Sequence, residues 1–317
     1  MVGLLAWMVV ACSAPGAGAP TERVSAAATT SAAAPTSASA SGSVAAPSAK
    51  AATPKPGEPF ACGELECRTF ATPTEALTFV LEKEKPLVLG LGESHAQKGD
   101  PKVPSTTARF TKDFLPVLAP QTSSLVLELW VADGSCGKAT EKKVAEQQKA
   151  VTKNQAEENP NEFLALGNKS KELGVVPFIL RPSCKEVETI KAAGDDAPLK
   201  MLDMITAGMT EQVKKRFAET KGKQPGKMVL TYGGAMHNDV APRKGREAWS
   251  FAGELTKLSE GRYVELDLIV PEFIKPDSPS WQGQPWFAAY DREAFGATNV
   301  LVQTGQRAYT LVFARTP

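Results

Sequence analysis

The stretch Pro86-Leu-Val-Leu-Gly-Leu-Gly-Glu-Ser-His95 decides the fold. It opens with a short apolar run bounded by proline and glycine, without the alternation of a strand that has one face in water. Such a run predicts a strand covered on both faces, as in a parallel sheet. Glu93 and His95 follow at its carboxyl end. Because ligands of open α/β sheets bind beyond the carboxyl ends of the strands, the same stretch also indicates a site.

Outward from this stretch, apolar runs alternate with helical patterns. Four more strands are predicted, at Ser124–Trp130, Val175–Leu180, Lys227–Tyr232 and Arg262–Val270. Helices are predicted at Thr107–Leu118, Thr140–Gln155, Asn161–Leu173, Leu199–Thr220 and Trp249–Leu258. This order predicts an α/β fold with a mostly parallel central sheet and helices on both faces. The segment Asn299–Phe313 predicts a hairpin that turns at Gly305 and forms an antiparallel edge of the sheet.

A helix start precedes the first predicted strand. Thr72 is a good N-cap, Pro73 suits the first turn, and Glu75 stands where a capping box requires it. The buried stripe of this helix is predicted to be Ala76, Leu77, Val80 and Leu81.

The chain divides into three regions. Residues 1–12 form an apolar run too short to span a bilayer, and they resemble a bacterial lipoprotein signal that ends at a lipidated Cys12. The alternative is a simple signal peptide with a chance cysteine. Residues 13–59 are almost wholly Ala, Ser, Thr, Pro and Gly, which predicts a disordered linker. Residues 60–317 are long enough for a single α/β domain.

Charge and export restrict the partners. The 36 basic and 35 acidic side chains nearly cancel, so we expect no binding to nucleic acid and no attraction to anionic lipid. Membrane contact is expected through the lipid anchor alone, in the bacterial cell envelope. The expected ligand is a small molecule or a peptide.

Besides Cys12, the chain has four cysteines, and export makes disulfides the default expectation. We predict Cys62–Cys67, which closes a short loop, and Cys136–Cys184, because each of these two follows a predicted strand end. A metal site built from the four cysteines is the weaker alternative, since their spacing matches no zinc pattern.

The only histidines, His95 and His237, each stand three residues after a glycine and at a predicted strand end. Glu93 lies two positions before His95, so in extended backbone both point to the same side. Glu128 interrupts the buried run Leu125–Trp130, where an unpaired charge is costly, and it therefore needs a partner or a catalytic duty. A frayed strand end in water is the alternative for Glu128.

Two imidazoles with one or two carboxylates permit two kinds of site. Glu93, His95 and His237 could bind a divalent metal such as Mn²⁺, Fe²⁺ or Zn²⁺. Without a metal, one histidine could take a proton from water while a carboxylate fixes its tautomer. A serine nucleophile at Ser94 is weaker, because the surrounding residues do not form a Gly-x-Ser-x-Gly elbow.

The motifs Gly92-Glu-Ser-His95, Leu125-Val-Leu-Glu128 and Gly234-Ala-Met-His237 resemble, in that order, those of one superfamily. It joins erythromycin esterases, ChaN-like haem-binding lipoproteins, and the TraB and Tiki proteins. The resemblance implies an α/β core with Glu93, His95, Glu128 and His237 at one end of the sheet. Erythromycin esterases space their glutamate and histidine one residue further apart and carry an arginine that has no match here, so the ChaN-like branch is favoured.

Together these features predict an envelope lipoprotein with a site like that of metal-dependent or histidine-based hydrolases. The alternative is a lipoprotein that binds haem or iron without turnover, as the ChaN-like resemblance implies, with Tyr232 as a candidate haem ligand. A degenerate site on an inherited fold is a third reading.

Overall fold

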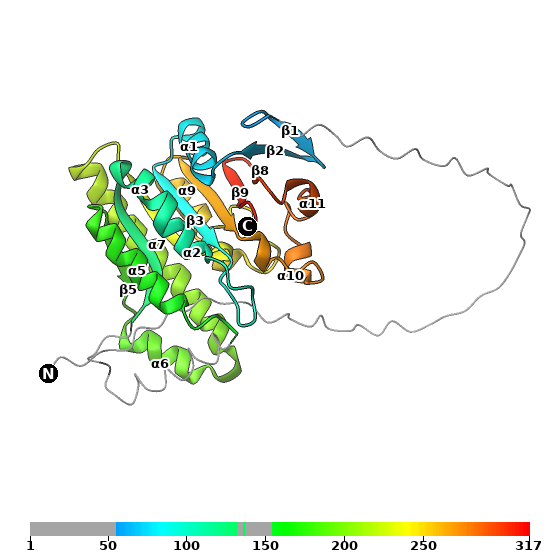
Figure 1. The fold of residues 1–317 in the computed structure, drawn as a ribbon. Coiled ribbons are helices and arrows are strands. Elements are labelled where there is room, and N and C mark those ends of the chain that lie inside the picture. The colour runs from blue at the N-terminus through cyan, green and yellow to red at the C-terminus, as the bar shows by residue number, and fades with distance from the viewer. Residues whose placement is uncertain (1–54, 132–135, 137–153) are drawn as a thin grey trace, which may run out of the picture. The chain divides into compact units, whose positions relative to one another are not determined.

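The computed structural model describes residues 55–131, 136 and 154–317, which form an α/β fold around one mixed sheet (Figure 1). The strand order is β1-β2-β8-β9-β7-β3-β6-β4-β5. The predicted signal with Cys12, the predicted linker up to residue 54 and nearly all of the helix predicted at Thr140–Gln155 lie outside the described residues. No helix in the described ranges is long and apolar enough to cross a membrane.

The five predicted apolar runs are strands, and they pair in parallel in the order β7-β3-β6-β4-β5. Their bounds are β3 (Val88–Glu93), β4 (Thr122–Trp130), β5 (Val176–Leu180), β6 (Met228–Gly234) and β7 (Tyr263–Ile269). Every residue of β3 and β4 is buried, as expected for strands covered on both faces. The prediction of an α/β fold with a mostly parallel sheet is confirmed.

The antiparallel edge is larger than predicted. The hairpin of β8 (Asn299–Gly305) and β9 (Ala308–Val312) forms, but β9 pairs in parallel with β7 and β8 pairs with β2 (Leu65–Phe70). The outermost strand is β1 (Phe60–Cys62), which pairs with β2. The C-terminal hairpin is therefore not the edge itself, because β2 satisfies the free hydrogen-bonding groups along β8.

The helices contribute to two hydrophobic clusters that also take alternate residues of the strands. The helical bounds are α1 (Pro73–Glu84), α2 (Thr106–Arg109), a π-helical turn (Phe110–Phe114), α3 (Leu115–Leu118), α5 (Asn159–Glu172), α6 (Cys184–Ala192), α7 (Ala197–Lys223), α8 (Ala235–Asn238), α9 (Ala252–Leu258), α10 (Pro279–Gln282) and α11 (Arg292–Phe295). Leu89 and Leu91 of β3 belong to a cluster with α1, the π-helical turn and α5, whereas Val88 belongs to one with α6, α7 and α9.

Helix α1 begins as its sequence predicts. The Thr72 hydroxyl accepts a hydrogen bond from the Glu75 amide at 3.2 Å, and the Glu75 carboxylate accepts one from the Thr72 amide at 3.2 Å. The four predicted core residues of this helix are buried. Short 3₁₀ turns occur at Ala119–Gln121, Gly194–Asp196, Glu247–Trp249 and Pro271–Phe273.

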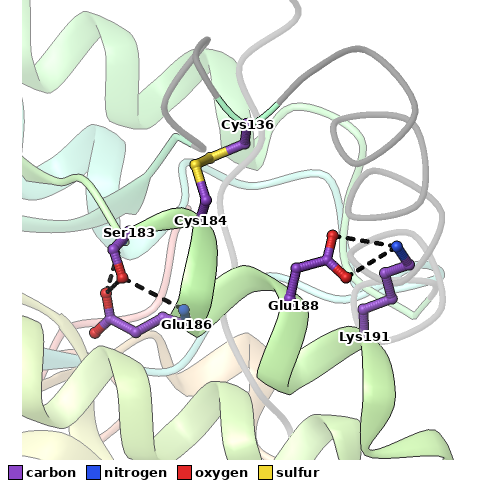
Figure 2. Close-up of a disulfide and its surroundings, with 6 residues drawn as sticks. All are labelled: Cys136, Ser183, Cys184, Glu186, Glu188 and Lys191. Atoms are coloured by element: carbon purple, nitrogen blue, oxygen red, sulfur yellow. Dashed lines mark hydrogen bonds and ion pairs between the residues drawn. A yellow bond between two sulfur atoms is a disulfide. The ribbon is translucent and has the colours of Figure 1, made fainter.

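Both predicted disulfides are present. Cys62–Cys67 links β1 to β2 with the Cα atoms 5.8 Å apart. Cys136–Cys184, with Cα atoms 5.2 Å apart, links residue 136 to the start of α6 (Figure 2). Figure 2 also shows the capping box of α6, in which Ser183 and Glu186 bond each other's backbone and side chain.

Candidate active site at the carboxyl ends of β3, β4 and β6

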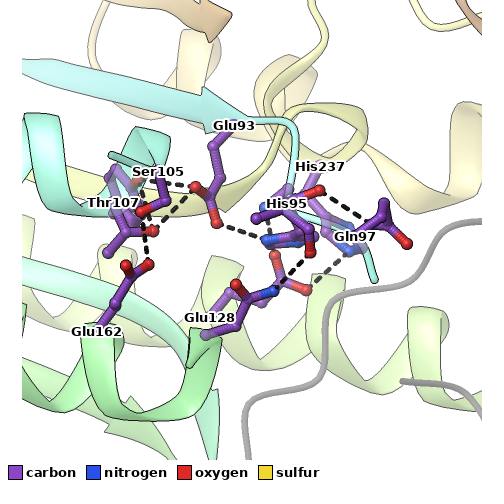
Figure 3. A network of polar contacts seen from close by, with 12 residues as sticks. Glu93, His95, Gln97, Ser105, Thr107, Glu128, Glu162 and His237 are labelled. Carbon is purple, nitrogen blue, oxygen red and sulfur yellow. Dashed lines mark hydrogen bonds and ion pairs between the residues drawn. The ribbon is translucent and has the colours of Figure 1, made fainter. Parts of the chain in front are cut away.

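The four predicted site residues meet at the carboxyl ends of three neighbouring strands (Figure 3). Glu93 ends β3, His95 follows it by two positions, Glu128 lies near the end of β4, and His237 lies in α8 directly after β6. The exposed fractions of these residues are 4%, 7%, 1% and 3%. Four buried polar side chains from three separate segments therefore share one region.

Glu93 holds His95 through its carboxylate. Oε1 of Glu93 lies 2.5 Å from Nδ1 of His95, while Oε2 accepts hydrogen bonds from the Thr107 hydroxyl at 2.9 Å and the Tyr232 hydroxyl at 3.0 Å. Both carboxylate oxygens are thus occupied. This arrangement favours an orienting role for Glu93 over the predicted role as a metal ligand.

The negative charge of Glu93 affects the protonation of both His95 and Tyr232. Burial opposes protonation of His95, but the charge and hydrogen bond of Glu93 and the charge of Glu128 outweigh it, so the pKa of His95 is raised. The pKa of Tyr232 is raised well above its ordinary value, by burial and then by the charge of Glu93. Tyr232 therefore keeps its proton and acts as a donor to Glu93.

His237 is held by the backbone instead. Its Nδ1 atom lies 2.8 Å from the carbonyl oxygen of Trp249 and 3.1 Å from the hydroxyl of Thr206. A carbonyl oxygen only accepts hydrogen bonds, so Nδ1 of His237 carries the proton. Nε2 of the same ring lies 3.6 Å from Oε1 of Glu128.

Only one of the two carboxylate oxygens of Glu128 makes a hydrogen bond. Oε2 accepts a hydrogen bond from the Gly234 amide at 2.5 Å, whereas Oε1 is buried without a hydrogen-bond partner. Nε2 of His95 is likewise buried and lacks a hydrogen-bond partner. An ideal Cβ on Gly234 would lie 3.4 Å from both His95 Nε2 and Glu128 Oε2, which places these two side chains around the same glycine.

The glycines before His237 have separate uses. A Cβ on Gly233 would lie 2.6 Å from the Cβ of Glu128, so only glycine at this position lets the Glu128 side chain lie against β6. Gly234 leaves the space between His95 and Glu128 open. The sequence Gly233-Gly234 thus accounts for both the approach of Glu128 and the room around it.

A second group of buried carboxylates adjoins the loop that follows His237. Glu265 of β7 accepts a hydrogen bond from the Val240 amide at 2.8 Å, and burial raises the pKa of Glu265 to about 8. Burial also raises the pKa of Asp267 well above its ordinary value, with the charge of Glu265 adding to the effect. Asp267 leans over Gly92, where any Cβ would collide with its carboxylate.

The groups that orient the two histidines are not among the site residues predicted from the sequence. Thr107 was expected only as the start of a helix, Tyr232 as a candidate haem ligand, and the Trp249 carbonyl not at all. In the structure the Tyr232 hydroxyl bonds Glu93 and is fully buried, which favours a role in holding Glu93 over haem ligation. A signal for Tyr232 existed, because a tyrosine within a fully buried strand needs a partner for its hydroxyl.

Metal binding is tested by the chemistry of the donor set. Among the described residues, no group of three or more His, Cys, Asp or Glu side chains stands ready-made to hold an ion. Two orphaned atoms, His95 Nε2 and Glu128 Oε1, are nevertheless of the types that Mn²⁺, Fe²⁺ and Zn²⁺ accept, and His237 Nε2 lies beside one of them. The donor atoms are therefore of the right chemical types for a metal ion, but the side chains would have to move closer together to bind one.

Comparison with family models and with curated proteins gives no match. Among solved structures, the chain is similar to one described as "The structure of the type III effector HopBA1". The sequence identity is 8%, the match covers 75% of this chain and 93% of that chain, and the TM-score is 0.37. A similarity this weak carries no argument, so function rests on the site itself.

Proposed function

We propose that this chain is an envelope lipoprotein whose α/β domain, with helices on both faces of the sheet, carries a metal-dependent hydrolase site. The substrate would be a small molecule or a peptide. One observation carries the proposal: His95 Nε2 and Glu128 Oε1 are both buried without a hydrogen-bond partner, on two side chains that flank Gly234. A buried carboxylate oxygen without a partner is costly, and a cation between these groups would offset that cost.

The orientation of both imidazoles supports this reading. Metal-binding histidines usually donate their second ring N–H to a carboxylate or a backbone carbonyl, which turns the other nitrogen toward the ion. His95 makes such a contact with Glu93, and His237 makes one with the Trp249 carbonyl. We therefore assign His95, Glu128 and His237 as the ligands, with Glu93 as the group that orients His95.

The chain's own residues would divide the work as follows. A bound divalent ion would supply Lewis-acid polarisation of a substrate oxygen and would acidify water. The Gly234 amide fixes Glu128 and the Glu93 carboxylate fixes His95, so both side chains are held in place to bind the ion. In the metal-free alternative, His95 would take a proton from water while Glu93 fixes its tautomer.

The ordered motifs that resemble the erythromycin esterase, ChaN-like, TraB and Tiki superfamily are consistent with this proposal. The ChaN-like resemblance supplies the rival, a lipoprotein that binds haem or iron without turnover. The two functions make opposite predictions about the purified protein, so one set of measurements separates them.

The test uses the full chain purified from its own host and from an expression host. We expect about one divalent ion per chain by elemental analysis, as for a site with three protein ligands. Glu128→Gln and His237→Ala should lose the ion, whereas Glu265→Gln, which changes a buried carboxylate outside the ligand set, should keep it. Ester, peptide and phosphoester panels would then be assayed with and without chelator.

Three results would contradict the proposal. Hydrolysis that survives chelation would favour the metal-free mechanism. A strong Soret band on mixing with haemin, lost in His95→Ala, would favour haem binding. Absence of metal, haem affinity and hydrolysis in the wild-type chain would indicate a degenerate site.

The anchor has a separate test. Cys12→Ala should abolish labelling by a radioactive fatty acid and release the chain from the membrane fraction, because a lipidated cysteine is the proposed attachment. Cys12→Ala with unchanged membrane association would show that another segment holds the chain.

A further inference from the structure

Behind His95, the hydroxyls of Thr107 and Tyr232 and one carboxylate oxygen of Glu93 form a triangle of close polar contacts. The Thr107 hydroxyl donates to Oε2 of Glu93 at 2.9 Å, the Tyr232 hydroxyl lies 3.0 Å from the same oxygen, and the two hydroxyls lie 3.2 Å apart. Thr107 comes from α2 and Tyr232 from β6, so two elements far apart in sequence hold one carboxylate. Neither residue is a ligand in the proposed site.

The triangle is rigid because its members are packed as well as bonded. Tyr232 is fully buried, and its ring stacks on Phe110 with centroids 4.7 Å apart and meets Phe163 edge-on at 5.6 Å. Thr107 is 2% exposed. The ring of Tyr232 therefore has one orientation, and its hydroxyl reaches Glu93 in that orientation.

Helix α2 is itself fixed. Its N-cap residue Ser105 accepts a hydrogen bond from the Ala108 amide at 3.0 Å and donates one to Glu162 of α5 at 2.5 Å (Figure 3). This contact ties the short helix that carries Thr107 to a longer one. The position of the Thr107 hydroxyl is thus set by the core rather than by a free loop.

We infer that Tyr232 and Thr107 are positioning residues of the proposed site, which hold Oε2 of Glu93 so that Oε1 receives the Nδ1 proton of His95. The inference rests on the proposed function for its purpose. A glutamate side chain has three rotatable bonds, and ordering it without such partners costs conformational entropy. With Oε2 held on one side, Nε2 of His95 faces Glu128, which is the orientation that ligand binding needs.

The experiment uses the fact that the chain contains only two histidines. Nitrogen-detected NMR of the full chain gives the tautomer of each ring, and His95→Ala and His237→Ala assign the signals. We compare Tyr232→Phe, Thr107→Val and the double variant with wild type. Tyr263→Phe is the matched control, because Tyr263 is also a buried strand tyrosine but donates to the Asn238 carbonyl at 2.9 Å.

In wild type we expect a slowly exchanging Nδ1 proton on His95. In the double variant this proton should exchange with water at least about tenfold faster, because Glu93 can then rotate away from the ring. Tyr232→Phe should show part of this effect while keeping the ring stacking, so folding is preserved. In Tyr263→Phe the His95 proton should exchange at the wild-type rate. The His237 signals should be the same as in wild type in the Tyr232 and Thr107 variants.

Metal titration with Mn²⁺ or Zn²⁺ supplies the second readout. Loss of an outer partner of a ligand typically weakens metal binding about 10- to 100-fold, and we expect this in the double variant. An unchanged His95 proton in a folded double variant would overturn the inference. If the His95 proton exchanges faster in the double variant but neither the wild type nor any variant binds metal, the positioning role stands and the metal-dependent function fails.

Discussion

The two histidine loops share a spacing but not a chemistry. Gly92-Glu-Ser-His95 and Gly234-Ala-Met-His237 each place a histidine three residues after a glycine at the end of a parallel strand. His95 gives its Nδ1 position to the carboxylate of Glu93, whereas His237 gives it to the backbone carbonyl of Trp249. A carboxylate both orients the imidazole ring and places a negative charge beside it, whereas a carbonyl orients the ring without a full charge.

The two rings therefore have different electrostatic surroundings. Burial lowers the pKa of His95, but the charge and hydrogen bond of Glu93 outweigh this effect and the pKa is raised. The carbonyl partner fixes the tautomer of His237 without a neighbouring charge on that side. Similar loops thus hold one imidazole through a charged partner and the other through a neutral one.

The largest expected effect comes from the glycines of the His237 loop. Gly233→Ala should lower the free energy of unfolding by about 1–3 kcal/mol and displace Glu128, because its methyl group would overlap the Glu128 side chain. Gly234→Ala should leave stability nearly unchanged, since its methyl would make ordinary contacts, but should weaken metal binding by filling the space beside His95. Urea denaturation and metal titration measure the two effects, and equal destabilisation by both alanines would contradict this division.

The next largest effect concerns Glu265, whose carboxylate bonds the loop that follows His237. The pKa of Glu265 is raised from 4.5 to about 8, so the folded state retains a proton that the unfolded state releases. The stability of the wild type should therefore fall as pH rises from about 4.5 to about 8, and the raised pKa of Asp267 adds to this fall. Glu265→Gln should remove more than about 1 kcal/mol of this fall, measured by urea denaturation across that range.

An exposed carboxylate serves as control for that measurement. Glu254→Gln, at a side chain that is 61% exposed, should follow the pH dependence of the wild type. A flat pH profile in the wild type itself would show that Glu265 is ionised in the folded state.

The smallest effect is the counterpart of the Thr107 substitution. Thr206 donates a hydrogen bond to the Trp249 carbonyl at 3.0 Å, so Thr206→Val should cost about 0.5–1.5 kcal/mol and alter the His237 NMR signals alone. Thr210→Val, one helical turn away and bonded only to the Thr206 carbonyl at 2.7 Å, is the matched control. A change in the His95 signals in Thr206→Val would mean that the two loops are not independent.

Much of the fold could be predicted because its signals are local. The capping box of α1 and the apolar runs of β3, β4, β6 and β7 need no information from distant residues. The convergence of the site residues follows from one rule, since parallel strands end on the same edge of a sheet. Glu128 was identified for a physical reason, the cost of a charge inside a buried strand.

What the sequence could not supply are contacts between distant segments. Strand β1 has only three residues, and the partner of β2 is β8, near the other end of the chain. The contact between the Thr107 and Tyr232 hydroxyls spans 125 positions, and a backbone carbonyl such as that of Trp249 has no signature in side-chain chemistry. Such pairings depend on how elements pack, which periodicity does not encode.

The place of β3 in the sheet has a consequence for how the chain is made. Both neighbours of β3, the strands β6 and β7, come from the last third of the chain. The backbone groups along both sides of β3 therefore stay without partners until nearly all of the domain has been synthesised, and late long-range pairing of this kind folds slowly. The site at the ends of β3, β4 and β6 therefore cannot assemble before β6, the last of these three strands in the chain, has been made.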